Sequence, residues 1–241
     1  MNRWNSWGAS VTGPGHVRDG KPNQDAWAVD HYEWGDVLVV SDGLGSCPHA
    51  EAGSRAACEA VKQAADFCFR HRKWESPDLP GLIQILWRMI VSPIPPEECS
   101  ATCLFVIREN GGRAVLGMLG DGLLAGVKAD GTVNLLVANK DDSFLNFTAS
   151  LSSTNVSTDW RILHSSESEY QGFLLCTDGI ADDLVPASAE LFVKASMAHY
   201  RNCSKEDLSA DLHHCLRDWP VPGHSDDKTI ACLFHVEEDN E

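Results

Sequence analysis

The chain has 241 residues, 43% hydrophobic and 22% charged, a globular balance that allows one large domain or two small ones. Acidic residues outnumber Lys and Arg by 35 to 19, and the net charge of −16 argues against a surface that binds nucleic acid or anionic membranes. No run of 18 apolar residues and no secretory leader occur, so we expect no membrane contact and a cytoplasmic protein.

The first part of the chain predicts strands followed by two helices. Apolar runs punctuated by Gly and Asp indicate strands at residues 6–13, 25–30 and 36–42. Residues 50–71 are rich in alanine and repeat apolar residues at three- and four-residue spacing, which predicts an amphipathic helix. Asp78 is the expected cap of a second helix over 79–91, which ends before Ser92-Pro93.

The remainder returns to strands. Short apolar runs at residues 101–137 are joined by hairpin signals at Asn110-Gly111-Gly112 and Asp130-Gly131. A polar, irregular segment at 145–160 precedes strands near 160–167 and 170–177, helices at 187–200 and 205–219, and a last strand at 228–236. Hairpin-joined strands with helices in two blocks predict an α+β fold of antiparallel sheets. Because many strands are apolar on both faces, we expect two stacked sheets covered by helices.

Four apolar segments carry aspartate at an end or a kink. They contain Asp42-Gly43, Asp121-Gly122, Asp178-Gly179 and Asp226-Asp227. An isolated buried carboxylate costs several kcal/mol, whereas converging carboxylates can coordinate Mg²⁺ or Mn²⁺. A following glycine lets the chain turn sharply and leaves a carbonyl open to an ion. Any single Asp-Gly pair is more often a turn than a ligand, and Asp130-Gly131 is expected to be a turn.

The motifs resemble, in order and over nearly the whole chain, those of the metal-dependent type 2C (PPM-class) protein serine/threonine phosphatases, in a compact bacterial form. The segments that carry the resemblance are "PNQDAWAV", "VVSDGLGS", "CSATCLFVI", "LGDGLLAGV", "LLCTDGIAD" and "SDDKTIACL". The resemblance implies a four-layer α/β/β/α sandwich of two mainly antiparallel sheets and a single phosphatase domain over residues 1–241. It also implies that the site holds two Mn²⁺ or Mg²⁺ ions, and a third ion that binds more weakly in some members.

The resemblance also implies a role for each acidic position. Asp42 would bridge the two ions, and the Gly43 carbonyl would bind one of them. Asp178 and Asp226 would hold the other ion, and Asp121 matches a position associated with the third. Further positions would act around the ions, with Asp25 and Asp182 orienting metal-bound water and Gln24 and Asp227 standing behind the ligands.

The implied reaction is hydrolysis of phosphoserine or phosphothreonine by a metal-activated water, without a protein nucleophile. The implied partner is a phosphorylated protein substrate, paired with a cognate serine/threonine kinase. No Cys lies in a Cys-x5-Arg phosphate loop, which disfavours a cysteine mechanism. The alternative is a pseudophosphatase or phosphoprotein-binding regulator without turnover, and a partner-switching enzyme with one dedicated substrate is a third possibility.

Three positions depart from the family pattern. Gln24 stands where the family has Glu, which predicts weaker metal binding and supports the pseudophosphatase alternative. Gly20 stands where the family has a phosphate-binding Arg. Arg18, Lys21 and His16 are candidates to replace it, although each could equally be an ordinary loop residue.

The third departure is Leu44, at a position where many eukaryotic members have a His that acts as general acid. His16 or His49 could take over this proton transfer, and so could metal-bound water. We name His16 with Asp25 and Asp42 as the candidate catalytic residues.

Overall fold

The computed structural model describes residues 3–70, 78–137, 149–152, 159–201 and 203–236. Its strands are β1 Arg3–Val11, β2 Asp25–Tyr32, β3 Gly35–Asp42, β4 Cys103–Glu109, β5 Arg113–Leu119, β6 Leu123–Lys128, β7 Val133–Val137, β8 Arg161–Ser166, β9 Tyr170–Cys176 and β10 Lys228–Val236. Its α-helices are α1 Pro14–Asp19, α2 Ala50–Arg70, α3 Leu79–Val91, α4 Asp178–Ala181, α5 Ala189–Tyr200 and α6 Lys205–Arg217. Short 3₁₀ turns occupy Pro96–Glu98, Glu167–Glu169 and Pro186–Ser188.

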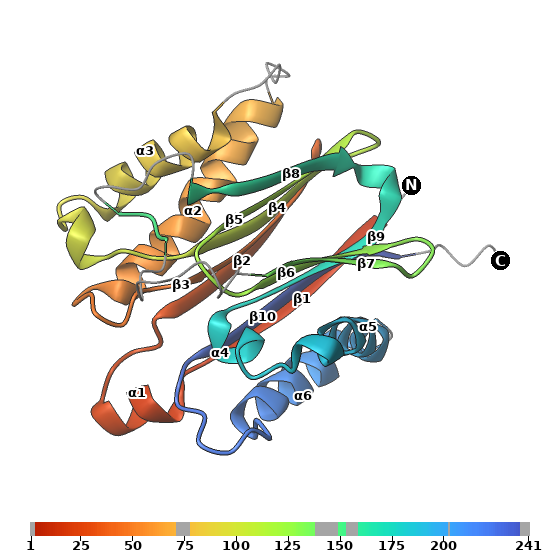
Figure 1. Cartoon of the computed structure of the whole chain (residues 1–241). Helices are drawn as coiled ribbons and strands as arrows, with labels where there is room; N and C mark the ends of the chain where they lie inside the picture. The colour runs from red at the N-terminus through yellow and green to blue at the C-terminus, as the bar shows by residue number, and fades with distance from the viewer. Residues whose placement is uncertain (1–2, 71–77, 138–148, 153–158, 202, 237–241) are drawn as a thin grey trace.

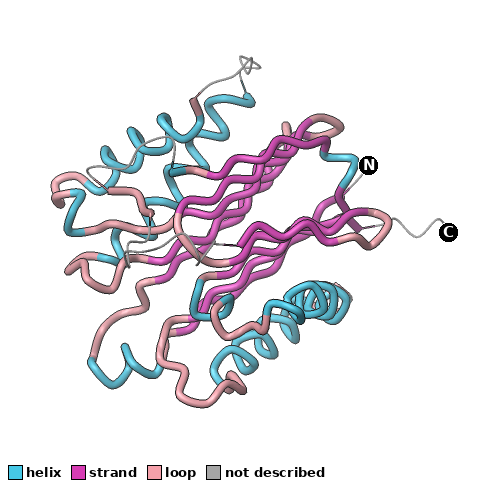
Figure 2. The backbone as a smooth tube through the Cα atoms, viewed as in Figure 1, coloured by secondary structure: helices cyan, strands magenta, loops and turns pink. Residues whose placement is uncertain are grey.

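Two five-stranded sheets lie face to face between two layers of helices (Figure 1). One sheet has the order β1-β10-β9-β6-β7 and the other the order β2-β3-β4-β5-β8, and all neighbouring strands are antiparallel. Helices α2 and α3 cover the second sheet, and α5 and α6 cover the first (Figure 2). The expected α+β sandwich is therefore confirmed.

Strand β3 shows why the sheets are covered on both sides. Its side chains alternate, so that Val37 and Val39 pack under α2 while Leu38 and Val40 pack against the other sheet. Three buried clusters follow from this pattern, one between the sheets and one beneath each helix layer. Within the described residues, no helix is long and apolar enough to cross a membrane.

The helix ends follow the capping residues closely. The Asp78 carboxylate accepts a hydrogen bond from the Gly81 amide at 3.0 Å, and the Ser204 hydroxyl accepts one from the Asp207 amide at 3.2 Å. The helix expected at 187–200 begins at Ala189, after a 3₁₀ turn, and the one expected at 205–219 ends at Arg217. Most of the irregular segment expected at 145–160 lies outside the described residues.

Helices α1 and α4 were not expected from the sequence. They have six and four residues, so neither completes the two turns over which an apolar period becomes visible. Both lie at the end of the sandwich where the acidic strand ends meet (Figure 1).

Candidate active site

The acidic segments meet at one end of the two sheets. Strands β2 and β3 place Asp25 directly opposite Asp42, and Gly43 continues into a bridge with Ala101. A cleft of about 220 Å³ opens there, lined by His16, Gln24, Asp42, Gly43, Leu44, Gly45, Thr102, Asp121, Asp178 and Asp226. Residues more than 200 positions apart in the chain thus share one concave surface.

Asp42 is fixed by the start of the neighbouring strand. Its amide donates to the Thr102 hydroxyl at 2.9 Å, and its carbonyl accepts from the Thr102 amide at 2.7 Å. A side chain at Gly43 would come within 2.2 Å of the Ala50 carbonyl oxygen, so this position requires glycine. Thr102 was not among the expected site residues, although the motif "CSATCLFVI" contains it.

Asp178 and Asp226 are brought together by close packing of two backbones. Asp178 begins helix α4 directly after β9. A Cβ atom on Gly179 would lie 1.9 Å from the Asp227 carbonyl oxygen and 3.4 Å from the Asp226 Cβ. Glycine therefore lets α4 press against the start of β10, which brings the two aspartates to the same wall of the cleft.

Asp121 reaches the cleft at the crossing between the sheets. Strand β5 belongs to one sheet and β6 to the other, and the three residues between them make the change. The flanking Gly120 and Gly122 have φ angles of +96° and +117°, which favour glycine strongly. The kink in this apolar run, visible in the sequence, is therefore a change of sheet.

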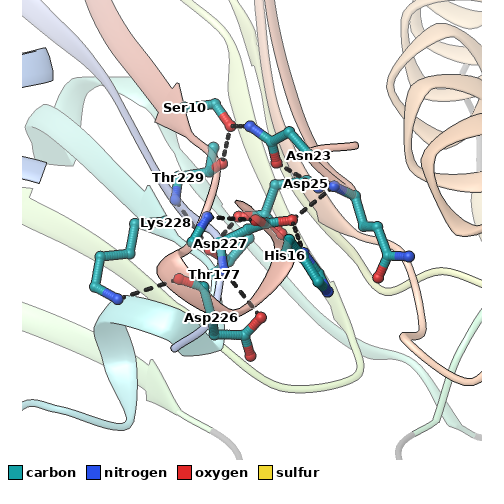
Figure 3. Close-up of polar contacts among 11 residues, drawn as sticks. Ser10, His16, Asn23, Asp25, Thr177, Asp226, Asp227, Lys228 and Thr229 are labelled. Atoms are coloured by element: carbon teal, nitrogen blue, oxygen red, sulfur yellow. Dashed lines mark hydrogen bonds and ion pairs between the residues drawn. The ribbon is translucent and has the colours of Figure 1, made fainter. Parts of the chain in front are cut away.

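Asp227 organises the segments around the cleft (Figure 3). This buried carboxylate accepts hydrogen bonds from the backbone amides of Gly13 and Gln24, each at 2.6 Å. It also contacts Nδ1 of His16 at 2.9 Å. One side chain just before the last strand thus fixes the entry to α1, the start of β2 and the orientation of the histidine.

Asp25 lies beneath the cleft in a chain of hydroxyl groups (Figure 3). It accepts a hydrogen bond from the Thr177 hydroxyl at 2.8 Å, and the Thr177 oxygen in turn accepts from the Thr229 amide at 3.1 Å. The Thr229 hydroxyl donates to the Ser10 oxygen at 2.6 Å, and the Asn23 amide group donates to the same oxygen at 2.7 Å. These hydrogen bonds hold Asp25 in place next to Asp42, on the side away from the cleft.

The carboxylates strongly perturb one another. Burial, opposed by hydrogen bonds, raises the pKa of Asp25 to about 6. Burial first, and the neighbouring Asp121 and Asp226 next, raise the pKa of Asp178 to about 7. Burial and the nearby Asp25 and Asp178 also hold the pKa of Asp42 well above its ordinary range. These groups resist losing their protons together, and a divalent cation between them would relieve that repulsion.

The donor set fits a hydrated ion rather than an enclosed one. Among the described residues, no three acidic, histidine or cysteine side chains converge tightly enough to enclose a metal. Mg²⁺ and related hard cations bind through one or two carboxylates and keep several waters. An open cleft with carboxylates on separate walls and a carbonyl at Gly43 suits that mode of binding.

Asp25 and Asp227 lie behind the lining of the cleft, and four further expected positions lie away from it. Asp182 ends helix α4, is exposed, and lines a neighbouring groove together with Leu184. Arg18 and Lys21 are exposed at and just beyond the end of α1, and Nε of Arg18 lies 3.0 Å from Asp19. His49 is also exposed, 3.9 Å from the Glu98 carboxylate. Arg18 lies on the short helix α1 and Asp182 directly follows the short helix α4, and motif spacing does not reveal the direction of either helix.

Comparison with known families decides the assignment. The signature of the family described as "Protein phosphatase 2C" matches residues 12–217. The chain belongs to this family. The resemblance drawn from the motifs is thus confirmed, and with it the expectation of a protein serine/threonine phosphatase.

Solved structures show the same fold at low sequence identity. A bacterial serine phosphatase has a TM-score of 0.65 and 14% identity, with 99% of this chain and 100% of that chain covered. RsbX in complex with magnesium has a TM-score of 0.62 and 15% identity, with 98% and 100% covered. The catalytic domain of the serine/threonine phosphatase PstP in complex with two manganese ions has a TM-score of 0.61 and 17% identity, with 98% and 100% covered. No curated protein matches the sequence significantly.

Proposed function

We propose that this protein hydrolyses phosphoserine and phosphothreonine on other proteins, with Mn²⁺ or Mg²⁺ held in the cleft around Asp42. The observation that carries the proposal is the convergence of Asp42, Asp121, Asp178 and Asp226 on one cleft in a chain of the phosphatase 2C family. Divalent cations supply a water that is acidic enough to react near neutral pH, and positive charge opposite the phosphoryl oxygens. Residues 1–241 act as one phosphatase domain in this proposal.

In this proposal the ligands would divide between two ions. Asp42 would serve both ions, and the Gly43 carbonyl would bind one of them. Asp178 and Asp226, on the opposing wall, would hold the other ion, and Asp121 would offer a weaker third position. The related structures solved with magnesium and with two manganese ions support this choice of metals.

His16 is proposed to protonate the leaving serine or threonine oxygen. It lines the cleft, and its Nδ1 is 2.9 Å from the Asp227 carboxylate. A histidine fixed through Nδ1 by a carboxylate presents Nε2 to the substrate, as in other enzymes that use such a pair. Asp227 is therefore a positioning residue for His16.

The charges at two neighbouring positions are exchanged relative to the family pattern. Gln24 is neutral where the family has Glu, and Asp227 is charged where the family motif has Asn. The Asp227 carboxylate accepts a hydrogen bond from the backbone amide of Gln24 at 2.6 Å, so a negative charge lies next to position 24 although the side chain there is neutral. We propose that this neighbouring charge compensates in part for the neutral side chain, which favours an active enzyme over the pseudophosphatase alternative.

The proposed substrate is a phosphorylated protein, and we propose a cognate serine/threonine kinase as its functional counterpart. The test uses protein treated with EDTA and returned to Mn²⁺, Mg²⁺ or neither. We expect hydrolysis of p-nitrophenyl phosphate and of a phosphothreonine peptide only with metal, and calorimetry should show the ions binding. Bound metal without any turnover would support the pseudophosphatase alternative instead.

A further inference from the structure

A second groove, which we call the basic groove, opens beside the catalytic cleft. It lies between the end of β1, helix α1 and the C-terminal end of α6, which are neighbours in Figure 1. Its volume is about 380 Å³, and Asp226 lines both this groove and the cleft. The two hollows therefore adjoin at Asp226.

The groove concentrates basic groups in a protein that is strongly acidic. Arg18, Arg217, His224 and Lys228 line it, with Asp226 as its one carboxylate, whereas the whole chain has 35 acidic and 19 basic residues. Arginine stays charged at any pH the protein meets. Among the described residues that line the groove, basic side chains thus outnumber carboxylates, in contrast to the molecule as a whole.

Both arginines are available to a ligand. The Arg18 side chain is 74% exposed, and its contact with the half-exposed Asp19 is the kind of surface pair that contributes little. Arg217 ends helix α6 and is exposed, and among the described residues no carboxylate lies within ion-pair distance of it. An incoming anion would therefore meet arginines without having to displace strong internal ion pairs.

The floor of the groove is formed by a buried lysine whose ammonium group has fixed polar partners. Lys228 is 1% exposed, and its Nζ lies 3.1 Å from His224 Nδ1 and 3.3 Å from the Asp226 carbonyl oxygen. Figure 3 shows its side chain running away from Asp25, with the ammonium group at that carbonyl. The ammonium also lies 5.9 Å from the centre of the Trp219 ring. Lys228 thereby ties the loop that carries His224 to the ligand segment of the cleft.

We infer that the basic groove binds acidic side chains that flank the phosphorylated residue of the substrate. This inference rests on the proposed function, because the phosphorylated residue is taken to occupy the cleft. An extended chain advances about 3.3 Å per residue, so aspartate or glutamate a few residues from the phosphate reaches the arginines. Complementary charge selects the occupant, since the rest of the surface would repel an acidic segment.

The test compares two phosphothreonine peptides of equal length. One carries aspartate or glutamate at the positions flanking phosphothreonine, and the other carries asparagine or glutamine there. We expect the wild type to favour the acidic peptide about tenfold in kcat/KM, through KM, with the preference shrinking from 50 to 500 mM salt. In Arg217→Gln the preference should fall severalfold, whereas the matched control Arg70→Gln, an exposed arginine at the end of α2, should keep it.

Fluorescence anisotropy of labelled peptides, in the presence of Mn²⁺, supplies a readout that does not require turnover. Tighter binding of the acidic peptide, lost in Arg217→Gln, would support the inference even in a protein without activity. Equal affinity for both peptides would overturn it, whether or not either peptide is hydrolysed. Hydrolysis of both peptides at equal rates would overturn the basic groove and leave the phosphatase assignment in place, whereas hydrolysis of neither would count against the proposed function alone.

Discussion

Strand β3 carries a carboxylate near each end, and the two ends of the molecule surround these groups differently. Asp36, near the start, accepts a hydrogen bond from Nε of Arg108 at 2.6 Å and lies 2.5 Å from Nδ1 of His31. The same arginine contacts Glu167 at 2.8 Å. Asp42, about 20 Å away at the other end, has carboxylates as neighbours.

The difference separates structural carboxylates from functional ones. At the first end the positive charge belongs to the fold, since Arg108 is 3% exposed and stacks 4.7 Å from the Trp4 ring. At the second end carboxylates are grouped and the pKa values of Asp42 and Asp178 are raised, so a cation from outside would stabilise their charged forms. A buried carboxylate beside a buried arginine needs nothing more, whereas a buried group of carboxylates points to a cation.

The sharpest way to test the functional end is Asp42→Asn. The amide keeps the shape of the side chain and removes the charge shared by the proposed ions. We expect phosphatase activity to fall by about 10³-fold or more, as for the loss of other central electrostatic groups. Metal-free stability should not fall, because a raised pKa already disfavours the charged form. Substantial Mn²⁺-dependent turnover by the folded variant would contradict the assignment of Asp42 as the shared ligand.

At the Asp36 end of β3, a substitution should lower the stability of the protein and not its metal-dependent chemistry. Arg108→Met leaves Asp36 and Glu167 buried without their cation, and we expect the free energy of unfolding to fall by about 3–5 kcal/mol. Urea titration measures this loss, and added Mn²⁺ should not restore it. The matched control is Arg70→Met on the exposed surface of α2. A loss in Arg108→Met no larger than in the control would show that the two ends do not differ as described.

The pH dependence of the metal-free protein offers a third test. The folded pKa values of Asp25 and Asp178, about 6 and about 7, lie above the value near 4 of an unfolded chain. The folded state therefore holds more protons between these values, and the contribution of these groups to stability falls as the pH rises from 4 to 7. In EDTA, the free energy of unfolding from urea titrations should therefore decrease less between pH 4 and 7 in Asp178→Asn than in the wild type. If the free energy of unfolding depends on pH equally in the variant and the wild type, the pKa of Asp178 is not raised by its surroundings.

The exchanged charges at Gln24 and Asp227 predict smaller effects on metal affinity. Gln24→Glu should tighten Mn²⁺ binding by about tenfold, since a nearby charge at an effective dielectric of about 20 contributes a few kcal/mol before desolvation. Asp227→Asn should weaken it by a similar factor, and the double variant should return close to the wild type. Calorimetric titration measures all four proteins. An unchanged affinity in Gln24→Glu would mean that this side chain does not face the ions.

The smallest effect is expected at an Asp-Gly pair outside the cleft. Asp130 lies in the turn between β6 and β7, where its carboxylate accepts the Thr132 amide at 2.8 Å. Asp130→Asn should therefore change the rate of p-nitrophenyl phosphate hydrolysis by less than about twofold, as for other surface positions. A severalfold loss would show that Asp-Gly pairs cannot be divided into turns and ligands by their position in the fold.

The sequence predicted the sandwich because its signals are local and repeated. The alanine-rich period of α2, the Asp78 cap and the alternation in β3 each identify an element without knowledge of the rest. The convergence of the Asp-Gly segments was predictable from the family resemblance, since each aspartate follows an apolar strand. The functional role of each residue remains a proposal.

Contacts that depend on short helices could not be predicted. Helix α1 exposes Arg18 and α4 exposes Asp182, and their direction depends on glycine packing against β10. The three contacts of Asp227 join residues 203 to 214 positions apart, which no local pattern encodes. The basic groove was missed for the same reason, because Arg18 and Arg217 are distant in sequence.

Strand β10 has a consequence for how the protein is made. It lies between β1 and β9, so the first strand of the chain has no partner in its sheet until this late strand arrives. Asp226 and Asp227 are the two residues just before this strand. During synthesis β1 must therefore wait for β10 before it can pair in its sheet, and such distant pairing is slow. A chain that ends before β10 thus lacks the partner of β1 as well as Asp226 and Asp227, whereas β2 to β5 can still pair with their neighbours in sequence.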